Sequence, residues 1–283
     1  MRARLATALL LLLLPALGGL GRAWASDRSF LSSDGVRLHY IERGRGPTIV
    51  LVPGWTMPAW IWQRQIEDFS HTYHVVAFDP RGQGASAIAP SGYEPGRRGQ
   101  DIAELLTRLG GPPVLLVGWS LGVLDVLAYV HAHGDSRIAG LVLVDNSVGE
   151  DPPPAFHPAL PGPRVPRPVK MRRFVRGMFA TPQPQAWLNR LTAATLRLPK
   201  RDADALLAYP VPRTYWKDAV YGTSRPILYI VRQGFAGQAE NLQAHRPNTE
   251  TVVLHGVGHA LFVDEPARFD ALVRAFIRRH VWR

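Results

Sequence analysis

The sequence predicts an α/β protein with a mostly parallel central sheet, helices on both faces and an inserted, mainly helical lid. From residue 48 to residue 144, apolar runs that suit buried strands alternate with segments that carry an apolar stripe at helical spacing. This alternation stops in a proline-rich segment, 151–168, and resumes at residue 226. Alternating strands and helices require a parallel sheet covered on both faces, and the interruption marks the lid.

The first 25 residues have the organisation of a secretory signal peptide. Arg2 and Arg4 precede an apolar run, 5–14, and Ala23-Trp24-Ala25 supplies the small residues that a signal peptidase requires. The apolar run is too short to span a bilayer, so we expect cleavage before Ser26 and no stable membrane span afterwards. An uncleaved anchor is the alternative. We therefore expect a bacterial protein that is exported to the periplasm or secreted.

Composition limits the kinds of protein that this chain can be. Its 283 residues, 46% of them apolar, suffice for one globular unit with a buried core. The sequence has no cysteine, which excludes disulfides and thiol chemistry. The net charge of +11 becomes +8 without the leader, which contains three arginines. We interpret this excess as a solvated basic surface and expect no nucleic-acid partner, because no nucleic-acid-binding motif is present.

The first part of the chain predicts a hairpin followed by alternating strands and helices. Asp34-Gly35, between strand-like segments at 29–33 and 36–41, is a turn that strongly favours a β-hairpin. Apolar runs and helical spacing predict the elements that follow: strands at 48–52 and 74–78, and helices at 59–69 and 97–109.

The next strand ends in the motif on which the functional prediction depends. An apolar run, 114–117, leads directly into Gly118-Trp119-Ser120-Leu121-Gly122 and then into an apolar helical segment, 121–130. Gly-x-Ser-x-Gly between a strand and a helix is typical of a nucleophile elbow, in which the serine backbone is strained. Only glycine at 118 and 122 leaves room for the crossing chains. We therefore predict that the Ser120 hydroxyl projects at the carboxyl edge of the sheet.

The second part of the chain completes the sheet and carries the lid. The strand at 138–144 ends at Asp145, and the eight prolines of the segment 151–168 exclude a central strand or a continuous helix there. Further elements are expected as helices at 169–179, 186–196, 202–207, 238–244 and 265–281 and strands at 226–231 and 251–254. The expected division is a core at 26–149, a lid at 150–222 and the remaining core at 223–283.

These residues resemble the α/β-hydrolase superfamily over nearly the whole mature chain. Besides the elbow, the resemblance rests on Leu51-Val52-Pro53-Gly54-Trp55, the loop 79–86, the lid insertion, and Gly258-His259 followed by Asp264-Glu265-Pro266. Gly54-Trp55 with Trp62, and Gly92-Tyr93 before the segment 101–106, look most like the branch of cofactor-free haloperoxidases, perhydrolases and esterases. The resemblance implies an α/β-hydrolase fold and no cofactor, and no metal-binding constellation is evident in the sequence.

The catalytic base and the oxyanion donors follow from the chemistry that a serine alcohol needs. Ser120 is a weak nucleophile unless a base takes its proton. His259 is the predicted base, because it lies after the last strand in the chain order Ser, acid, His. The predicted oxyanion hole consists of the backbone amides of Trp55 and Leu121.

Two positions depart from the family pattern, and the second of them leaves the acid less directly indicated than the base. Pro53 stands where many members have histidine, which should be tolerated because the oxyanion donor is a backbone amide. The segment 232–237 lacks the aspartate that most members place there. Asp145 is the predicted acid, since haloalkane dehalogenases and certain lipases place theirs at this strand end. Glu240 is the alternative acid, and a Ser–His dyad or another carboxylate stays open.

The expected reaction is acyl transfer from a small ester-type substrate to water through an acyl-enzyme, with lactones or amides as variants. Serine at the elbow argues against dehalogenase and epoxide-hydrolase chemistry, which use a carboxylate nucleophile. Two alternatives stay open. The acyl group could pass to peroxide or an alcohol, as in a perhydrolase or acyltransferase, or the protein could be a catalytically silent ligand-binding protein on a hydrolase scaffold.

Overall fold

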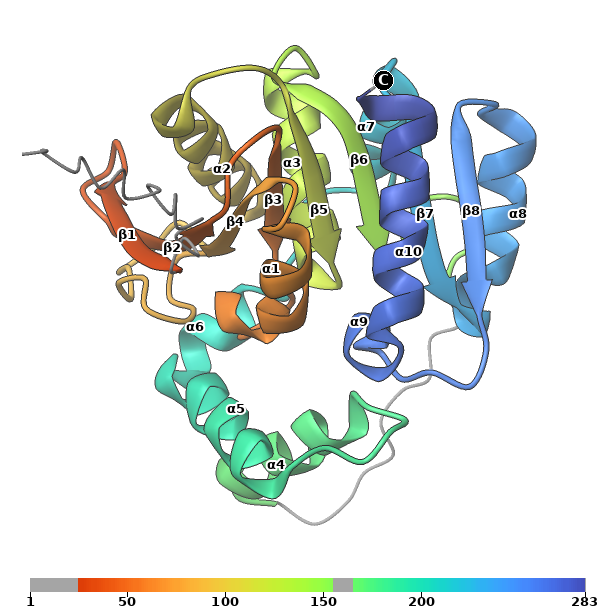
Figure 1. The fold of residues 1–283 in the computed structure, drawn as a ribbon. Helices are drawn as coiled ribbons and strands as arrows, with labels where there is room; N and C mark the ends of the chain where they lie inside the picture. The colour runs from red at the N-terminus through yellow and green to blue at the C-terminus, as the bar shows by residue number, and fades with distance from the viewer. Residues whose placement is uncertain (1–24, 155–164, 283) are drawn as a thin grey trace, which may run out of the picture.

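The central sheet of the protein has eight strands and is mostly parallel (Figure 1). The computed structural model describes residues 25–154 and 165–282, so the expected signal peptide lies outside the described residues apart from Ala25. The strands are β1 (Ser26–Leu31), β2 (Arg37–Arg43), β3 (Thr48–Val52), β4 (His74–Asp79), β5 (Val114–Trp119), β6 (Ile138–Val144), β7 (Ile227–Arg232) and β8 (Thr249–Leu254). Their order is β1-β2-β4-β3-β5-β6-β7-β8.

The antiparallel part of the sheet is confined to its first edge. The pairs β1–β2 and β2–β4 are antiparallel, and the five remaining pairs are parallel. The β1–β2 pair is the hairpin predicted at Asp34-Gly35, where Gly35 has φ 78°. The mostly parallel sheet confirms the predicted fold class.

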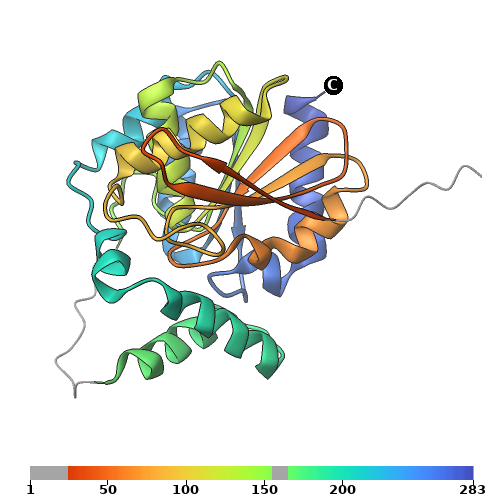
Figure 2. The ribbon, with the colours of Figure 1, turned by 90° about the vertical axis from the view of Figure 1, so that its left-hand side faces the viewer.

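Helices cover both faces of the sheet (Figure 2). One face carries α2 (Pro95–Leu109), α3 (Leu121–His133), α7 (Thr214–Gly222) and α8 (Ala236–His245), and the other carries α1 (Gln63–Phe69) and α10 (Pro266–Phe276). Successive strand residues enter opposite cores: Val50 belongs to the first, and Ile49 and Leu51 to the second. This double burial explains why the strands read as continuous apolar runs.

Several helix boundaries differ from the prediction. The segment expected as one helix at 59–69 is a 3-10 helix, η1 (Ala59–Trp62), followed by α1. The closing helix ends at Phe276 and continues as a π-helical turn, η3 (Ile277–Val281). α7 and the short α9 (Leu261–Asp264) were not predicted. None of the helices within the described ranges is long and apolar enough to cross a bilayer.

Three of the described helices between β6 and β7 form a layer, here called the lid, beyond the carboxyl edge of the sheet (Figure 1). This layer consists of α4 (Arg167–Gly177), α5 (Gln185–Arg197) and α6 (Lys200–Ala205). Pro166, Pro184 and Pro199 stand immediately before these helices, where a missing N–H costs nothing. α7, which also lies within the expected lid segment, instead packs on α3, where the Trp216 indole donates to the Leu124 carbonyl.

Candidate active site

The turn at Ser120 has the backbone of a nucleophile elbow. Ser120 lies between β5 and α3 and has φ 54° and ψ −123°, a conformation that residues other than glycine rarely adopt. A Cβ on Gly118 would come within 2.4 Å of the Gly122 carbonyl oxygen. A Cβ on Gly122 would come equally close, 2.4 Å, to the Val52 carbonyl oxygen. Both positions therefore require glycine, as the sequence predicts.

His259 bridges Ser120 and Asp145. Its Nε2 lies 2.8 Å from Ser120 Oγ, and its Nδ1 lies 2.6 Å from Asp145 Oδ2. The three residues follow β8, β5 and β6, so the carboxyl ends of three strands bring them together. In this arrangement Nδ1 carries the proton, and Nε2 is oriented to accept the serine proton.

Asp145 is buried at the end of β6, and its carboxylate is held on both oxygens. Its side chain is 0% exposed. Besides the bond to His259, Oδ2 accepts from Arg232 Nε at 2.6 Å, and Oδ1 accepts from the Arg232 backbone N–H at 3.0 Å. Glu240, the alternative acid, is exposed on α8 and does not contact His259 within the described residues. The structure therefore places Asp145, not Glu240, against the imidazole.

Two backbone N–H groups near Ser120 are available to an oxyanion. Trp55 follows β3, and Leu121 is the first residue of α3, so neither N–H belongs to a strand ladder or a helical turn. In residues 25–154 and 165–282, neither of them donates a hydrogen bond. Gly54 packs directly on Ser120, where an added Cβ would lie 3.3 Å from Oγ. The N–H groups predicted as the oxyanion hole are thus unoccupied by protein acceptors in that part of the chain.

Gln83 holds the turn that presents Trp55, a role that the sequence analysis missed. Its Oε1 accepts the Thr56 N–H at 2.5 Å, and its Nε2 donates to the Gly54 carbonyl at 3.2 Å. Thr56 has φ 58°, in the left-handed region, so the turn is strained and the buried amide stabilises it. The sequence signal that could have indicated this role was the loop 79–86, which contains Gln83.

Asn146 and Tyr229 support the elbow from the neighbouring strands. The Asn146 side chain donates to the Ser120 carbonyl at 2.8 Å, and the Tyr229 hydroxyl donates to the Asn146 carbonyl at 2.8 Å. Burial, and next the charge of Asp145, raises the pKa of Tyr229. The phenol therefore stays protonated and remains a donor.

The loop that carries His259 is joined to the lid through Asp264. One oxygen of Asp264 accepts the N–H of Gly258 at 2.7 Å and that of Ala180 at 2.9 Å. Ala260 N–H also donates to the Met178 carbonyl at 3.0 Å. A Cβ on Gly258 would come within 2.4 Å of the same carbonyl, so glycine permits this close approach.

The lid also reaches the oxyanion turn. The Phe174 ring of α4 meets the Trp55 ring edge-on, with centroids 5.1 Å apart. The Trp55 indole N–H donates to the Ala203 carbonyl of α6 at 2.7 Å. Two lid helices therefore contact Trp55, the residue that supplies a candidate oxyanion donor. The lid thus does more than cover the core.

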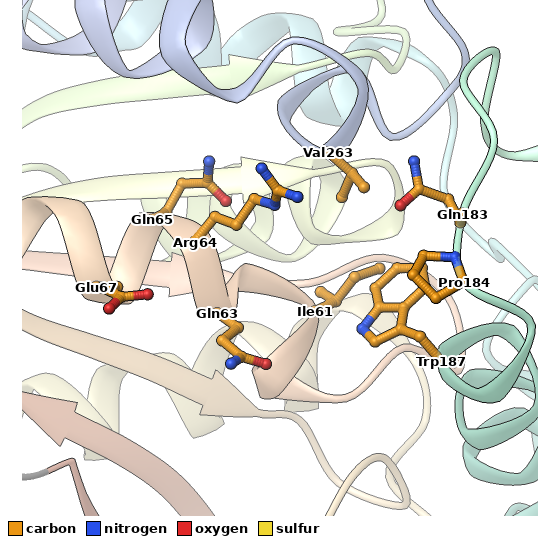
Figure 3. Close-up of a pocket in the computed structure, with 9 residues that line it drawn as sticks. All are labelled: Ile61, Gln63, Arg64, Gln65, Glu67, Gln183, Pro184, Trp187 and Val263. Carbon is orange, nitrogen blue, oxygen red and sulfur yellow. The ribbon is translucent and has the colours of Figure 1, made fainter.

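A cavity of about 400 Å³ lies at the seam between the lid and α1 (Figure 3). Ile61, Val263 and Trp187 form its apolar wall, and Arg64 and Gln65 are among its polar lining residues. None of the triad residues lines this cavity. The cavity lies beside α9, which follows His259 closely in the chain. It therefore belongs to the boundary between the lid and the core and is not the reacting centre.

Within the described residues, no group of three or more His, Cys, Asp or Glu side chains is arranged to hold a metal ion. The charged groups in contact with the His259 ring in that part of the chain are Asp145 and Arg232. The site therefore offers a hydroxyl, an imidazole, a carboxylate and two amides, which is the set that acyl transfer requires.

Comparison with known proteins shows the family of the chain. Residues 49–272 match the model of the alpha/beta hydrolase family. The chain is 34% identical over 112 residues to the non-heme chloroperoxidase CPO-A1 of Kitasatospora aureofaciens, over 39% of this chain and 41% of that protein. It thus spans about two-fifths of that relative's length. It is 27% identical over 257 residues to a pimeloyl-[acyl-carrier protein] methyl ester esterase of Vibrio campbellii, over 84% of this chain and 98% of that one.

Among solved structures, the esterase RhEst1 from Rhodococcus sp. ECU1013 superposes with a TM-score of 0.76 at 27% identity, over 90% of this chain and 99% of that one. The family match extends from β3 into α10 and therefore includes the elbow, the lid and the histidine loop. The chain belongs to the α/β-hydrolase family.

Proposed function

We propose that the protein is a serine hydrolase that cleaves small carboxylic esters, with lactones or amides as related substrates, through an acyl-enzyme. The observation that carries the proposal is the continuous path from Ser120 Oγ through His259 to Asp145, with contacts of 2.8 Å and 2.6 Å. Similarity to esterases over most of the chain supports it.

In the first half-reaction, Ser120 Oγ attacks the carbonyl carbon while His259 Nε2 takes its proton. Asp145 stabilises the imidazolium that forms, and the N–H groups of Trp55 and Leu121 bind the oxyanion. The leaving alcohol then takes the proton from Nε2. In the second half-reaction, water attacks the acyl carbon as it gives a proton to Nε2. The bond between that carbon and Ser120 Oγ then breaks, Oγ takes the proton back from Nε2, and the carboxylic acid leaves.

Labelling with a fluorophosphonate and hydrolysis of chromogenic esters of graded chain length test this proposal. The parent should be labelled covalently, and Ser120→Ala should lose both labelling and hydrolysis. Asp145→Asn should lower kcat by about three to four orders of magnitude, because the imidazole loses its orienting partner. Glu240→Gln should retain the parental rate. Failure of the folded parent to be labelled would instead favour a silent binding protein, and loss of activity in Glu240→Gln alone would refute the assigned acid.

A second candidate function is acyl transfer to hydrogen peroxide or an alcohol. Similarity to non-heme haloperoxidases, at 34% identity over 39% and 40% of this chain, favours it. The two acceptors compete for one acyl-enzyme. Peracid formation that exceeds hydrolysis at millimolar peroxide would support the perhydrolase, and hydrolysis that peroxide does not divert would support the esterase.

We also propose that residues 1–25 direct export and are removed, which leaves Ser26 as the first residue of a periplasmic or secreted protein. The sequence of this segment supports the proposal. N-terminal sequencing of the exported protein tests it, since a retained Met1 would indicate an uncleaved anchor.

A further inference from the structure

Arg232 lies beside the Ser120–His259–Asp145 site, and the proposed mechanism assigns it no role. It is the last residue of β7, the neighbour of β6, whose end carries Asp145. Its Nε lies 2.6 Å from Asp145 Oδ2, its backbone N–H lies 3.0 Å from Asp145 Oδ1, and its Nη2 lies 3.5 Å from His259 Nδ1. One residue thus contacts both oxygens of the acid and the edge of the base.

The charge of Asp145 requires a partner of this kind. Its side chain is 0% exposed, and a buried carboxylate is strongly disfavoured unless a cation or several donors compensate it. The neutral His259 supplies one N–H but no net charge before the reaction. In the described part of the chain, Arg232 is the cation in contact with Asp145.

The geometry also fixes the direction of the carboxylate. Asp145 has φ 50°, and its two oxygens accept from the backbone and the side chain of one residue. This two-point contact leaves Oδ2 directed at His259 Nδ1. A carboxylate held this way keeps the ring proton on Nδ1 and leaves Nε2 free for Ser120.

An ordinary surface ion pair differs from this arrangement in a way that can be measured. The Arg232 side chain is 40% exposed, and an exposed pair contributes little to stability. If Arg232 were only such a pair, its removal would leave the Asp145–His259 hydrogen bond and the reactivity of Ser120 unchanged.

We infer that Arg232 is a positioning residue that directs the Asp145 carboxylate at His259, and thereby keeps His259 in the orientation that activates Ser120. The inference rests on the proposed serine-hydrolase function. Arg232 lies on the Nδ1 side of the ring, away from Ser120, so its effect should appear in kcat rather than in substrate binding.

The experiment compares Arg232→Met, Arg232→Lys and a matched control, Arg225→Met. Arg225 lies just before the opposite end of β7, where it pairs with Asp135 at 3.8 Å, so the control removes the same charge at a pair that is longer and more exposed. Three readouts are measured on folded protein: the rate of fluorophosphonate labelling, kcat and KM for an ester, and the downfield proton resonance of the His259 Nδ1–H.

Arg232→Met should lower kcat and the labelling rate by about 10- to 100-fold with KM within about threefold, as expected for loss of a charge-assisted hydrogen bond. Arg232→Lys should recover part of this loss, because it restores the charge without the planar geometry of the guanidinium, while the backbone N–H contact to Asp145 Oδ1 stays in every variant. The Nδ1–H resonance should shift or disappear in Arg232→Met and persist in Arg225→Met.

Parental rates and an unchanged resonance in Arg232→Met would overturn the inference. So would equal losses in Arg232→Met and Arg225→Met, because these would indicate a general effect of charge. Failure of the proposed function would look different: the parent itself would resist labelling. In that case the resonance still decides whether Arg232 orients the Asp145–His259 pair. If Arg232→Met does not fold, Arg232→Lys carries the same comparison.

Discussion

Gln83 shows how a single side chain that never meets substrate can set the geometry of a reaction centre. Its amide satisfies an N–H and a carbonyl of the turn on either side of Trp55, and it is 3% exposed. The position of the Trp55 N–H therefore depends on a hydrogen bond to Thr56, which has a strained backbone.

Gln83→Leu should lower kcat by about 10- to 100-fold, because the turn loses its buried partners and one oxyanion donor moves. KM should change less, since the donor acts mainly on the transition state. Ester hydrolysis and thermal unfolding measure the two effects. Gln63→Leu is the control, because Gln63 is an exposed glutamine of α1. Unchanged kcat in a folded Gln83→Leu would show that the turn holds its shape without the amide.

The residues that the sequence could predict are those whose chemistry is tied to a local motif. Ser120 is defined by the elbow, and His259 by its place after the last strand. Asp145 and Glu240 both satisfied the requirement for a carboxylate, and only the three-dimensional structure separates them. Gln83 and Arg232 were not predicted, because their partners lie 27 and 87 residues away in the chain.

The lid and the histidine loop are joined by hydrogen bonds between backbone segments that are distant in sequence. Asp264 of α9 accepts from Gly258 in the loop and from Ala180 in the lid. Both donors are backbone N–H groups, so one carboxylate joins the two segments, in addition to the hydrogen bond from Ala260 N–H to the Met178 carbonyl.

Asp264→Ala should loosen both segments together and lower kcat by about tenfold, because His259 loses part of its support. Hydrogen exchange should increase at 178–181 and 258–260 together. Glu265→Ala is the control, since Glu265 is the next residue and pairs with Arg268 on the surface. Faster exchange in only one of the two segments would show that Asp264 does not connect them.

Most helices and strands could be predicted, and the two missed helices have physical explanations. α9 has four residues, too few to show helical spacing. α7 mixes polar and aromatic residues and owes its place to packing, since Trp216 and Val220 are buried in the core that α3 shares. The hairpin, the parallel strands and the lid helices were predicted because their signals are local.

A carboxyl group buried between α1 and α10 makes the stability of the protein depend on pH. Asp270 of α10 is 8% exposed and accepts from the Gln65 amide of α1 at 3.0 Å. Burial raises the pKa of Asp270 to about 6, although the Gln65 hydrogen bond opposes this shift. The folded protein therefore binds this proton more tightly than the unfolded chain does.

The free energy of unfolding should consequently decrease as pH rises from about 4 to 6, because the folded form holds the proton of Asp270 more firmly over this range. Above pH 6 the full cost of the buried charge should be present. Asp270→Asn keeps the acceptor for Gln65 and removes the charge. It should raise the free energy of unfolding by about 1–2 kcal/mol at pH 8, which is a few degrees in Tm, and should have little effect at pH 4. Thermal unfolding of both proteins across this range measures the difference. Equal Tm differences at both pH values would contradict the assignment.

The hydrogen bond from Ala260 N–H to the Met178 carbonyl couples the position of the lid to that of the histidine loop. A lid that swung outward would break this hydrogen bond and unseat the segment that bears the imidazole, so a wide-open form of the enzyme would also be an idle one. The chemical steps should therefore take place only while the lid contacts the loop that carries His259.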